Sequence, residues 1–278
     1  MKMETGVGRH YRVESWFERV ASGSARRAPR WLRDPLKRAY ARLLAAMPGN
    51  SLVCRLPGGE SFRVDPEFRH LAWNPEEYAA LKESVAPGST VLDVGANVGA
   101  YTLLFATWIG TSGRVIAFEP AAASRAGLHR HLALNGLAQR VEVRPEAVSD
   151  VTGTLMFRDA GTQGDNRIVP RATDGATPTP SLTIDDICER ARLAPDVIKI
   201  DVEGAELAAL RGARRTIAAR GRSMALFVEL HPSIWPLLGI TRHDVEAELR
   251  HQLLSVEALP GITDPWSVEG VCVRLRMA

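Results

Sequence analysis

The stretch "VLDVGANVGAYTLLFA", residues 91–106, decides the fold. Its first residues are typical of a short buried strand that ends near Asp93, and its last residues are apolar enough for a buried helix. Between them lie Gly95, Asn97 and Gly99. Glycine lets the backbone approach a ligand closely, and the first turn of a helix carries partial positive charge. The pattern therefore predicts a cofactor loop between a strand and a helix.

Strands and helices alternate outward from this loop. The predicted strands are "TVLDVG", "RVIAFEP", "RVEVR", "GTLMFRD", "DVIKIDVEG", "SMALFVELHP", "LLSVEAL" and "EGVCVRLRM". The predicted helices cover residues 98–109, 121–134, 205–220 and 242–253, with a short capped helix in "SLTIDDICERA". Such alternation predicts an α/β fold with a doubly wound, mostly parallel sheet. The stretch at 160–180 is rich in Gly, Pro, Thr and Asp without periodicity, which is typical of a binding loop or lid.

The chain divides into three predicted parts. Residues 1–50 form a basic extension with eleven Lys or Arg against four Asp or Glu, a balance of +7, whereas the other 228 residues have 24 against 28, or −4. Two amphipathic helices are expected in the extension, around Val13–Val20 and Leu36–Met47; they serve either as a docking element or as a cap on the domain. Residues 51–85 are a β-hairpin and helix lead-in, and residues 86–278 are the catalytic domain.

Composition limits the class of protein. The 278 residues contain 45% hydrophobic and 24% charged side chains, as in ordinary globular proteins. No apolar run is long enough for a transmembrane segment and none resembles a signal peptide, so we expect a cytoplasmic protein. The three cysteines are too far apart for a zinc or redox motif, and we expect them to be reduced.

The loop favours S-adenosylmethionine over NAD as cofactor. The dinucleotide fingerprint needs three glycines, and Asn97 replaces the middle one. Asp93 would repel a pyrophosphate but would attract the ammonium or sulfonium of S-adenosylmethionine. Glu119, at the end of the next strand, is placed to accept hydrogen bonds from two ribose hydroxyls. Glu146 lies after the third strand and either accepts from the adenine amino group or is a solvated loop carboxylate.

Several motifs in the right order resemble one known family. "VLDVGANVGAYTLLFA", "VIAFEP", "EAVSD", "LTIDDI", "VIKIDVEGAELAALRGA" and "FVELHP" look like the FkbM-type S-adenosylmethionine-dependent methyltransferases, over roughly residues 85–235. The resemblance implies a class I methyltransferase (Rossmann-like) fold, whose seven-stranded sheet has an antiparallel last strand. It also implies O-methylation of a sugar, polyketide or other secondary metabolite. The expected cofactor-binding residues are Asp93, Gly95, Asn97, Gly99, Tyr101, Thr102, Glu119, Pro120, Glu146, Ala147 and Asp201.

The candidate catalytic residues lie on two strands expected to be neighbours. Alternation places Lys199 with Asp201 on one face, and Phe227, Glu229 and His231 on one face. His231 is the first choice as general base, because its ordinary pKa of about 6.5 suits neutral pH; otherwise it only caps its strand. Asp201 is expected to orient the cofactor or acceptor.

Three further roles are open in this cluster. Glu203 is expected to assist catalysis. Lys199 and Glu229 are expected to form a structural ion pair, since a buried charge needs a partner. A divalent metal held by Asp201, Glu229 and His231 is a further alternative, although the sequence lacks a dedicated metal motif.

Other functions remain open at this point. A carboxyl or N-methyltransferase acting on a small molecule fits the same residues. An NAD(P)-dependent oxidoreductase is less favoured, because Asn97 and Asp93 do not suit a dinucleotide. A noncatalytic cofactor-binding protein is less favoured, because the polar cluster suggests catalysis. The signature of nucleic-acid base methylases is absent after the fourth strand, where "DVEG" stands, so a small-molecule acceptor and no nucleic acid is expected.

Overall fold

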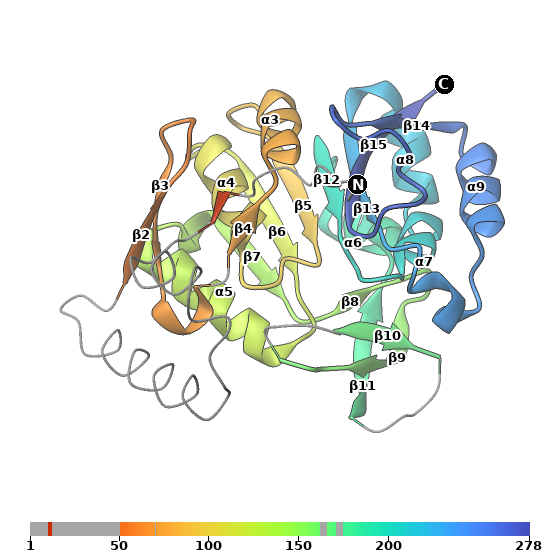
Figure 1. Ribbon diagram of the computed structural model, residues 1–278, viewed down its shortest axis with the longest axis horizontal. Helices are drawn as coiled ribbons and strands as arrows, with labels where there is room; N and C mark the ends of the chain where they lie inside the picture. Colours follow the sequence, from red (N-terminus) through yellow and green to blue (C-terminus); the bar gives the residue numbers. More distant parts are fainter. Residues whose placement is uncertain (1–10, 13–50, 70, 162–165, 171–174) are drawn as a thin grey trace, which may run out of the picture.

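The central feature of the computed structural model is a seven-stranded sheet (Figure 1). The structure describes residues 11–12, 51–69, 71–161, 166–170 and 175–278. The strand order is β14-β15-β13-β12-β5-β6-β7. The strands are β5 (Thr90–Val94), β6 (Arg114–Phe118), β7 (Val141–Arg144), β12 (Val197–Ile200), β13 (Ala225–Leu230), β14 (Leu254–Ala258) and β15 (Val271–Met277).

Strand directions confirm the predicted sheet. The strands β5, β6, β7, β12 and β13 pair in parallel, and β15 is antiparallel to both of its neighbours, β13 and β14. The last strand of the chain is therefore inserted against the direction of the other six. This arrangement is the class I methyltransferase topology, and it places the loops after β5, β6, β12 and β13 at one edge of the sheet, where open α/β sheets bind ligands.

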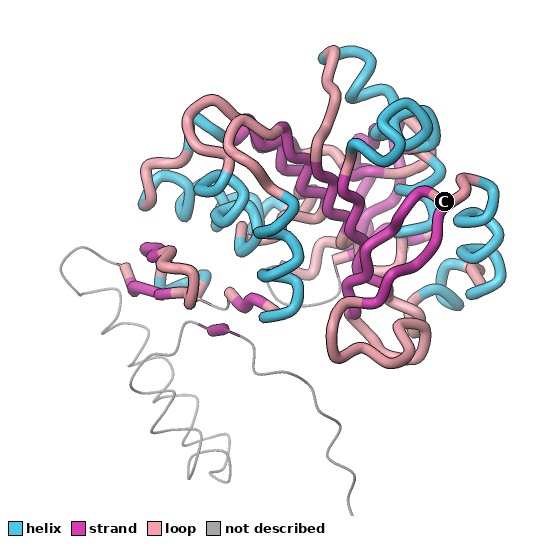
Figure 2. The backbone as a smooth tube through the Cα atoms, turned by 90° about the horizontal axis from the view of Figure 1, so that it is seen from above, coloured by secondary structure: helices cyan, strands magenta, loops and turns pink. Residues whose placement is uncertain are grey.

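Helices cover both faces of this sheet, as Figure 2 shows. The helices are α3 (Pro75–Ser84), α4 (Ala100–Trp108), α5 (Ala122–Leu134), α6 (Ile184–Ala191), α7 (Glu206–Arg211), α8 (Arg214–Arg220) and α9 (Arg242–His251). One apolar core joins alternate strand residues to α3, α4 and α5, and the other joins the remaining strand residues to α6, α7, α8 and α9. None of the described helices is both long and apolar enough to span a membrane.

Short elements precede the sheet. The strands β2 (Leu52–Arg55) and β3 (Ser61–Val64) pair antiparallel, which confirms the predicted hairpin. They are followed by the 3-10 turn η2 (Pro66–Phe68) and β4 (Ala72–Trp73), which pairs with β1 (Tyr11–Arg12). Further 3-10 turns lie at η3 (Ala138–Arg140), η4 (Gly221–Ser223) and η5 (Trp235–Leu238). The two helices expected around residues 13–20 and 36–47 lie outside the described residues.

A second sheet corrects the prediction of an aperiodic loop at 160–180. It contains β8 (Ala147–Val148), β9 (Gly153–Arg158), β10 (Arg167–Val169) and β11 (Ala176–Leu182), in the order β10-β9-β11-β8. Residues 167–169 and 176–181 both pair antiparallel with β9. The Thr and Pro residues of β11 hide it from a hydrophobicity pattern, because Leu182 is its one large apolar residue.

The helix expected over residues 205–220 is two helices, α7 and α8. They are interrupted at Gly212, where a Cβ atom would lie 2.1 Å from the carbonyl oxygen of Ser149. The backbone of Gly212 also accepts a hydrogen bond from the N–H of Asp185. The break therefore follows from close backbone approach at a glycine, which leaves no signal in the helical periodicity.

Candidate cofactor pocket and polar cluster

The loop after β5 is held against the end of β6. The N–H groups of Gly95 and Ala96 both donate to the carbonyl oxygen of Phe118, and the N–H of Asn97 donates to Glu119 Oε2 at 2.7 Å. These three donors are therefore used inside the protein, and the loop does not present them to an anion. Asn97 has φ +48°, a left-handed conformation that asparagine tolerates better than most residues.

A pocket opens beside this loop, with about 640 Å³ of space including its mouth. Seven of the predicted cofactor-binding residues line it: Gly95, Asn97, Glu119, Pro120, Glu146, Ala147 and Asp201. The remaining walls are Val94, Phe118, Val148, Phe157, Asn166, Ile168, Val202 and Glu203. The carboxyl ends of β5, β6 and β12 thus contribute polar groups, and the second sheet contributes an apolar wall.

Glu119 is the central acid of the pocket. It is 5% exposed, and its two carboxylate oxygens accept from the N–H groups of Asn97 and Ala121 at 2.7 and 2.8 Å. Burial raises the pKa of Glu119 to about 7, although these hydrogen bonds and the Arg125 guanidinium act in the opposite direction. Each carboxylate oxygen can accept a second hydrogen bond, so Glu119 retains acceptor capacity toward the pocket.

Glu146 is an ion-paired pocket residue. Its carboxylate lies 2.7 Å from Arg144 Nη2 and 3.2 Å from Arg144 Nε. This pair lowers the pKa of Glu146. The structure thus places Glu146 at the pocket wall in an ion pair with Arg144, and its contact with adenine stays a prediction.

Four predicted cofactor residues do not line the pocket: Asp93, Gly99, Tyr101 and Thr102. Asp93 is 2% exposed and accepts a hydrogen bond of 2.5 Å from Thr102 Oγ1. Burial raises the pKa of Asp93 to about 6. Tyr101 packs with its ring 4.5 Å from Lys199 Nζ. In this structure these residues form the packing behind the loop.

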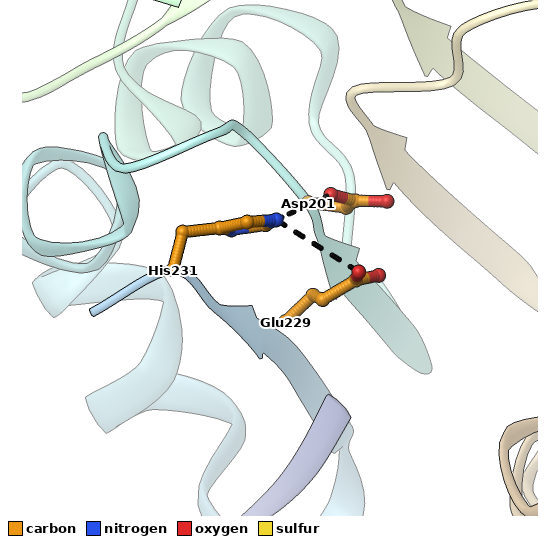
Figure 3. A group of neighbouring side chains, drawn as sticks. All are labelled: Asp201, Glu229 and His231. Atoms are coloured by element: carbon orange, nitrogen blue, oxygen red, sulfur yellow. Dashed lines mark ion pairs between the residues drawn. The ribbon is translucent and has the colours of Figure 1, made fainter. Parts of the chain in front are cut away.

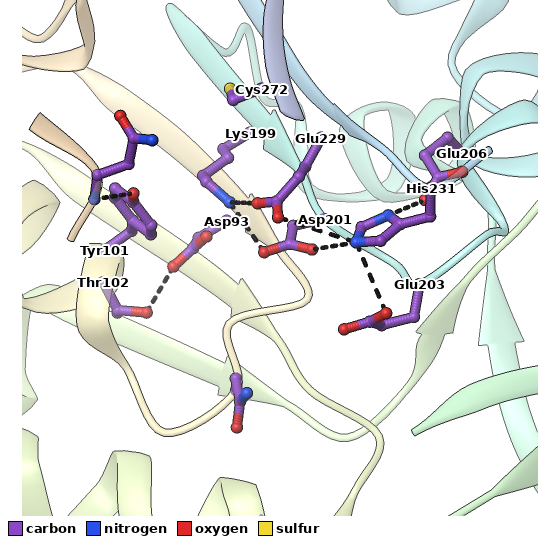
Figure 4. A network of polar contacts seen from close by, with 12 residues as sticks. Asp93, Tyr101, Thr102, Lys199, Asp201, Glu203, Glu206, Glu229, His231 and Cys272 are labelled. Atoms are coloured by element: carbon purple, nitrogen blue, oxygen red, sulfur yellow. Dashed lines mark hydrogen bonds and ion pairs between the residues drawn. The ribbon is translucent and has the colours of Figure 1, made fainter. Parts of the chain in front are cut away.

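Next to the pocket lies a polar cluster formed by the ends of β12 and β13 (Figure 4). Lys199 Nζ lies 3.1 Å from Asp201 Oδ2 and 3.6 Å from Glu229 Oε2, which confirms the predicted Lys199–Glu229 ion pair. Lys199 is 2% exposed. Although burial lowers its pKa, the charges of Asp201, Glu229 and Glu77 outweigh burial, so the pKa lies well above its ordinary value.

His231 faces the same carboxylates from the end of β13. Its Nε2 atom lies 3.9 Å from Asp201 Oδ1, 3.6 Å from Glu203 Oε2 and 3.8 Å from Glu229 Oε1. Its Nδ1 atom lies 2.8 Å from Oε1 of Glu206, a residue with no exposed surface. The alternation of side chains along β12 and β13 therefore correctly predicted that Asp201, Glu229 and His231 lie close together.

The pKa of His231 differs from the ordinary value that was the reason for choosing it as the general base. Burial lowers its pKa, but Glu206, Asp201 and Glu229 outweigh burial and raise the pKa to about 10. An imidazole with this pKa is charged at neutral pH and cannot take up a proton. The expectation of an ordinary pKa failed because it ignored Glu206, which reaches His231 from the first turn of α7.

Sequence reasoning missed the wall formed by Phe157, Asn166 and Ile168. Phe157 belongs to β9, which was predicted as a strand without a role in the site, whereas Asn166 and Ile168 fall in the stretch 160–180, which was predicted as a binding loop or lid. It also missed Glu206 as a partner of His231. The "EGAE" run offered a weak signal, since it places Glu206 three residues after Glu203 in the loop that follows β12.

Comparison with known proteins identifies a family. Residues 93–255 match the model of the methyltransferase FkbM domain. A search of curated proteins found no match. Three of the solved structures that are similar to this chain are the following. An FkbM methyltransferase from Methylobacillus flagellatus KT is 22% identical, with 72% of this chain and 50% of that chain covered and a TM-score of 0.45. This chain thus spans half the length of that protein.

The other two structures are more distant in sequence. An S-adenosylmethionine-dependent O-methyltransferase from Thermotoga maritima is 14% identical, with 81% of this chain and 77% of that chain covered and a TM-score of 0.42. Fibrillarin from Aeropyrum pernix, solved with natively bound S-adenosyl-L-methionine, is 15% identical, with coverages of 84% and 86% and a TM-score of 0.42.

Proposed function

Because the chain belongs to the FkbM methyltransferase family, whose cofactor is S-adenosylmethionine, we propose that it methylates a hydroxyl group of a small-molecule acceptor. One observation carries this proposal: Asp201 and Glu203 belong both to the wall of the cofactor pocket and to the polar cluster. A methyl donor in the pocket would therefore lie beside ionisable groups that can bind an acceptor and take up its proton. A sugar, polyketide or related secondary metabolite is the proposed acceptor class.

The pocket residues fit the cofactor. Glu119 keeps acceptor capacity for ribose hydroxyls, and the apolar side chains of Phe118, Val148 and Ile168 suit the faces of an adenine ring. The acidic groups Asp201 and Glu203 favour a cationic sulfonium and would oppose a pyrophosphate. The internal use of the N–H groups of Gly95, Ala96 and Asn97 also disfavours a dinucleotide.

Methyl transfer requires alignment and a proton acceptor. Bound S-adenosylmethionine supplies an activated methyl group, and the protein must hold the acceptor oxygen within about 3 to 3.5 Å of it. As the new O–C bond forms and the S–C bond breaks, the hydroxyl proton must leave. We assign this proton to Glu203, whose carboxylate is 43% exposed, lines the pocket and lies 3.6 Å from His231 Nε2. Glu203 has φ +47°, a strained conformation that fits a functional position.

Substitution tests the role of Glu203. In Glu203→Gln the turnover is expected to fall at least about a hundredfold, the usual contribution of a general base. The affinity for S-adenosylhomocysteine is expected to change by less than about threefold, because the cofactor has its ribose and adenine contacts elsewhere in the pocket. Glu83→Gln, at an exposed carboxylate of α3, is the control. Turnover that is nearly normal in Glu203→Gln would remove Glu203 from the mechanism.

Two measurements on the full chain test the function itself. Calorimetric titration should show binding of S-adenosylhomocysteine and none of NADH; the reverse result would overturn the methyltransferase proposal. A panel of sugars, polyketides, small acids and amines is then incubated with S-adenosylmethionine and analysed by mass spectrometry. Gain of one methyl group on a hydroxyl supports O-methylation, whereas methylation only of acids or amines would replace it by carboxyl or N-methylation.

A further inference from the structure

We propose that Asp201, Glu229 and His231 bind one divalent cation of the Mn²⁺ or Mg²⁺ class beside the cofactor pocket (Figure 3). One donor atom from each of these three residues lies within 4.8 Å of the other two. The three side chains point toward a common point from the ends of two adjacent parallel strands. The orientation of His231 supports a cation at this point.

Glu206 fixes the imidazole. Carboxylates only accept hydrogen bonds when ionised, so the 2.8 Å contact with Glu206 Oε1 requires the proton of His231 to be on Nδ1. Glu206 itself is held by the N–H of Gly204 at 2.8 Å and by Trp235 Nε1 at 2.7 Å. The carboxylate–histidine arrangement is the usual support for a metal-binding histidine, because it keeps a proton on Nδ1 and directs Nε2 to the metal, which would displace the Nε2 proton of the charged imidazole.

The Nε2 atom has no hydrogen bond to a described residue, although the His231 side chain is 5% exposed. The carboxylate oxygens it faces are 3.6 Å away in Glu203, 3.8 Å away in Glu229 and 3.9 Å away in Asp201, beyond hydrogen-bond range. A cation about 2.1 Å from each of two donors accommodates donor separations up to about 4.2 Å. The gap between these atoms is therefore too long for a direct hydrogen bond and suitable for a bridging ion.

Lys199 leaves one oxygen of each carboxylate available. It contacts Asp201 Oδ2 and Glu229 Oε2, whereas Asp201 Oδ1 and Glu229 Oε1 face His231. Among the buried residues that the structure describes, Lys199 is the one lysine or arginine. The carboxylates of Asp201, Glu203 and Glu229 all face His231 Nε2, and a divalent cation at this point would reduce the repulsion among those that are ionised.

The donor set selects the class of ion. Two carboxylates favour Mg²⁺ or Mn²⁺, and the single imidazole favours Mn²⁺ over Mg²⁺. Under the proposed function, an ion at this point would also bind the acceptor oxygen next to the methyl donor. That second role rests on the proposed function, whereas binding of the ion does not.

Electron paramagnetic resonance tests binding without any assay of activity. The full chain is freed of metal with a chelator and titrated with Mn²⁺ alone, and the signal of free Mn²⁺ is recorded. We expect one Mn²⁺ per chain and competition by Mg²⁺. His231→Ala and Glu229→Gln should each weaken Mn²⁺ binding at least tenfold, whereas Glu246→Gln, on the surface helix α9, should leave it unchanged. Circular dichroism checks that each variant is folded.

Glu206→Gln provides a second test that keeps the direct ligands. Loss of the carboxylate that orients His231 should weaken Mn²⁺ binding about 10- to 100-fold. Absence of Mn²⁺ binding by the native chain, or binding unchanged in both His231→Ala and Glu229→Gln, would overturn the metal site. Calorimetry with S-adenosylhomocysteine separates the two proposals, since the cofactor can bind in a chain that fails to bind Mn²⁺.

Discussion

At the scale of single residues, we predict that Glu119 makes cofactor affinity depend on pH. Its pKa of about 7 in the free protein reflects burial and the charge of Asp201, opposed by the Asn97 and Ala121 N–H groups and by Arg125. Ribose hydroxyls donate to the ionised carboxylate, so binding lowers this pKa and releases a proton at lower pH. The affinity for S-adenosylhomocysteine should therefore be constant above about pH 7.5 and fall by up to tenfold per unit below pH 7.

Calorimetry between pH 5.5 and 8.5 measures this dependence. Glu119→Gln should bind S-adenosylhomocysteine more weakly and with a flatter pH profile, because the side chain no longer titrates. The matched control is the exposed Glu83→Gln, which should keep the native profile. An affinity of the native chain that is the same at pH 5.5 and pH 8 would show that Glu119 does not hold the ribose.

The residue scale also shows what the sequence could predict at the site. Glu119, Asp201 and Glu203 follow strands directly, so strand order alone placed them at the pocket edge. The protonation state of His231 could not be predicted from the sequence, because its pKa depends on Glu206. The first turn of α7 brings Glu206 next to His231. Asp93 was expected to face the ligand, but its side chain turns to Thr102 on α4 instead.

At the scale of elements, the turn from β5 to α4 depends on Gly95. This residue has φ +87°, and a Cβ atom there would lie 1.7 Å from the carbonyl oxygen of Asp201. Gly136, after α5, also has a positive φ, +65°, but a Cβ atom there would meet nothing within 4 Å. The two glycines share the backbone requirement, and only Gly95 also lacks space for a side chain.

Gly136→Ala should therefore lower the free energy of unfolding by about 1 to 2 kcal/mol, the cost of a left-handed alanine. Gly95→Ala should cost more and should also abolish binding of S-adenosylhomocysteine, because β5 and the end of β12 must separate. Urea unfolding and calorimetry measure the two effects. Equal destabilisation of both variants, with cofactor binding retained in Gly95→Ala, would contradict the importance of this close approach.

Among the strands, hydrophobic patterns predicted those of the large sheet but not β11. The strands β5, β6, β12 and β13 of the large sheet are buried on both faces and appear as apolar runs, so they were predicted correctly. In β11, the residues Pro178 and Pro180 argued against a strand, yet they pair with β9 where β11 has no described partner on its other side. Proline is tolerated at such edges, because its nitrogen can face away from the neighbouring strand.

At the scale of the whole molecule, Glu60 joins three elements of the domain. It is buried next to the β2–β3 turn and accepts from Tyr78 Oη at 2.7 Å, from Lys82 Nζ at 2.8 Å and from Trp108 Nε1 at 2.8 Å. The hairpin, α3 and α4 are thus linked by one carboxylate. No motif indicated this contact, since its partners lie 18 to 48 residues away in the chain.

The acid stability of the molecule should depend on Glu60. Burial raises its pKa, but the hydrogen bonds from Lys82, Trp108 and Tyr78 outweigh burial and lower it to about 2. Because the ordinary value is 4.5, the stabilisation is fully present above about pH 4.5 and is lost as the pH falls toward 2. Glu60→Gln should therefore be less stable than the native chain at pH 7 and should lose less further stability between pH 5 and pH 3. Urea unfolding at several pH values measures this, with the exposed Glu83→Gln as control. A parallel loss of stability in the native chain and Glu60→Gln over this range would show that other carboxylates control acid unfolding.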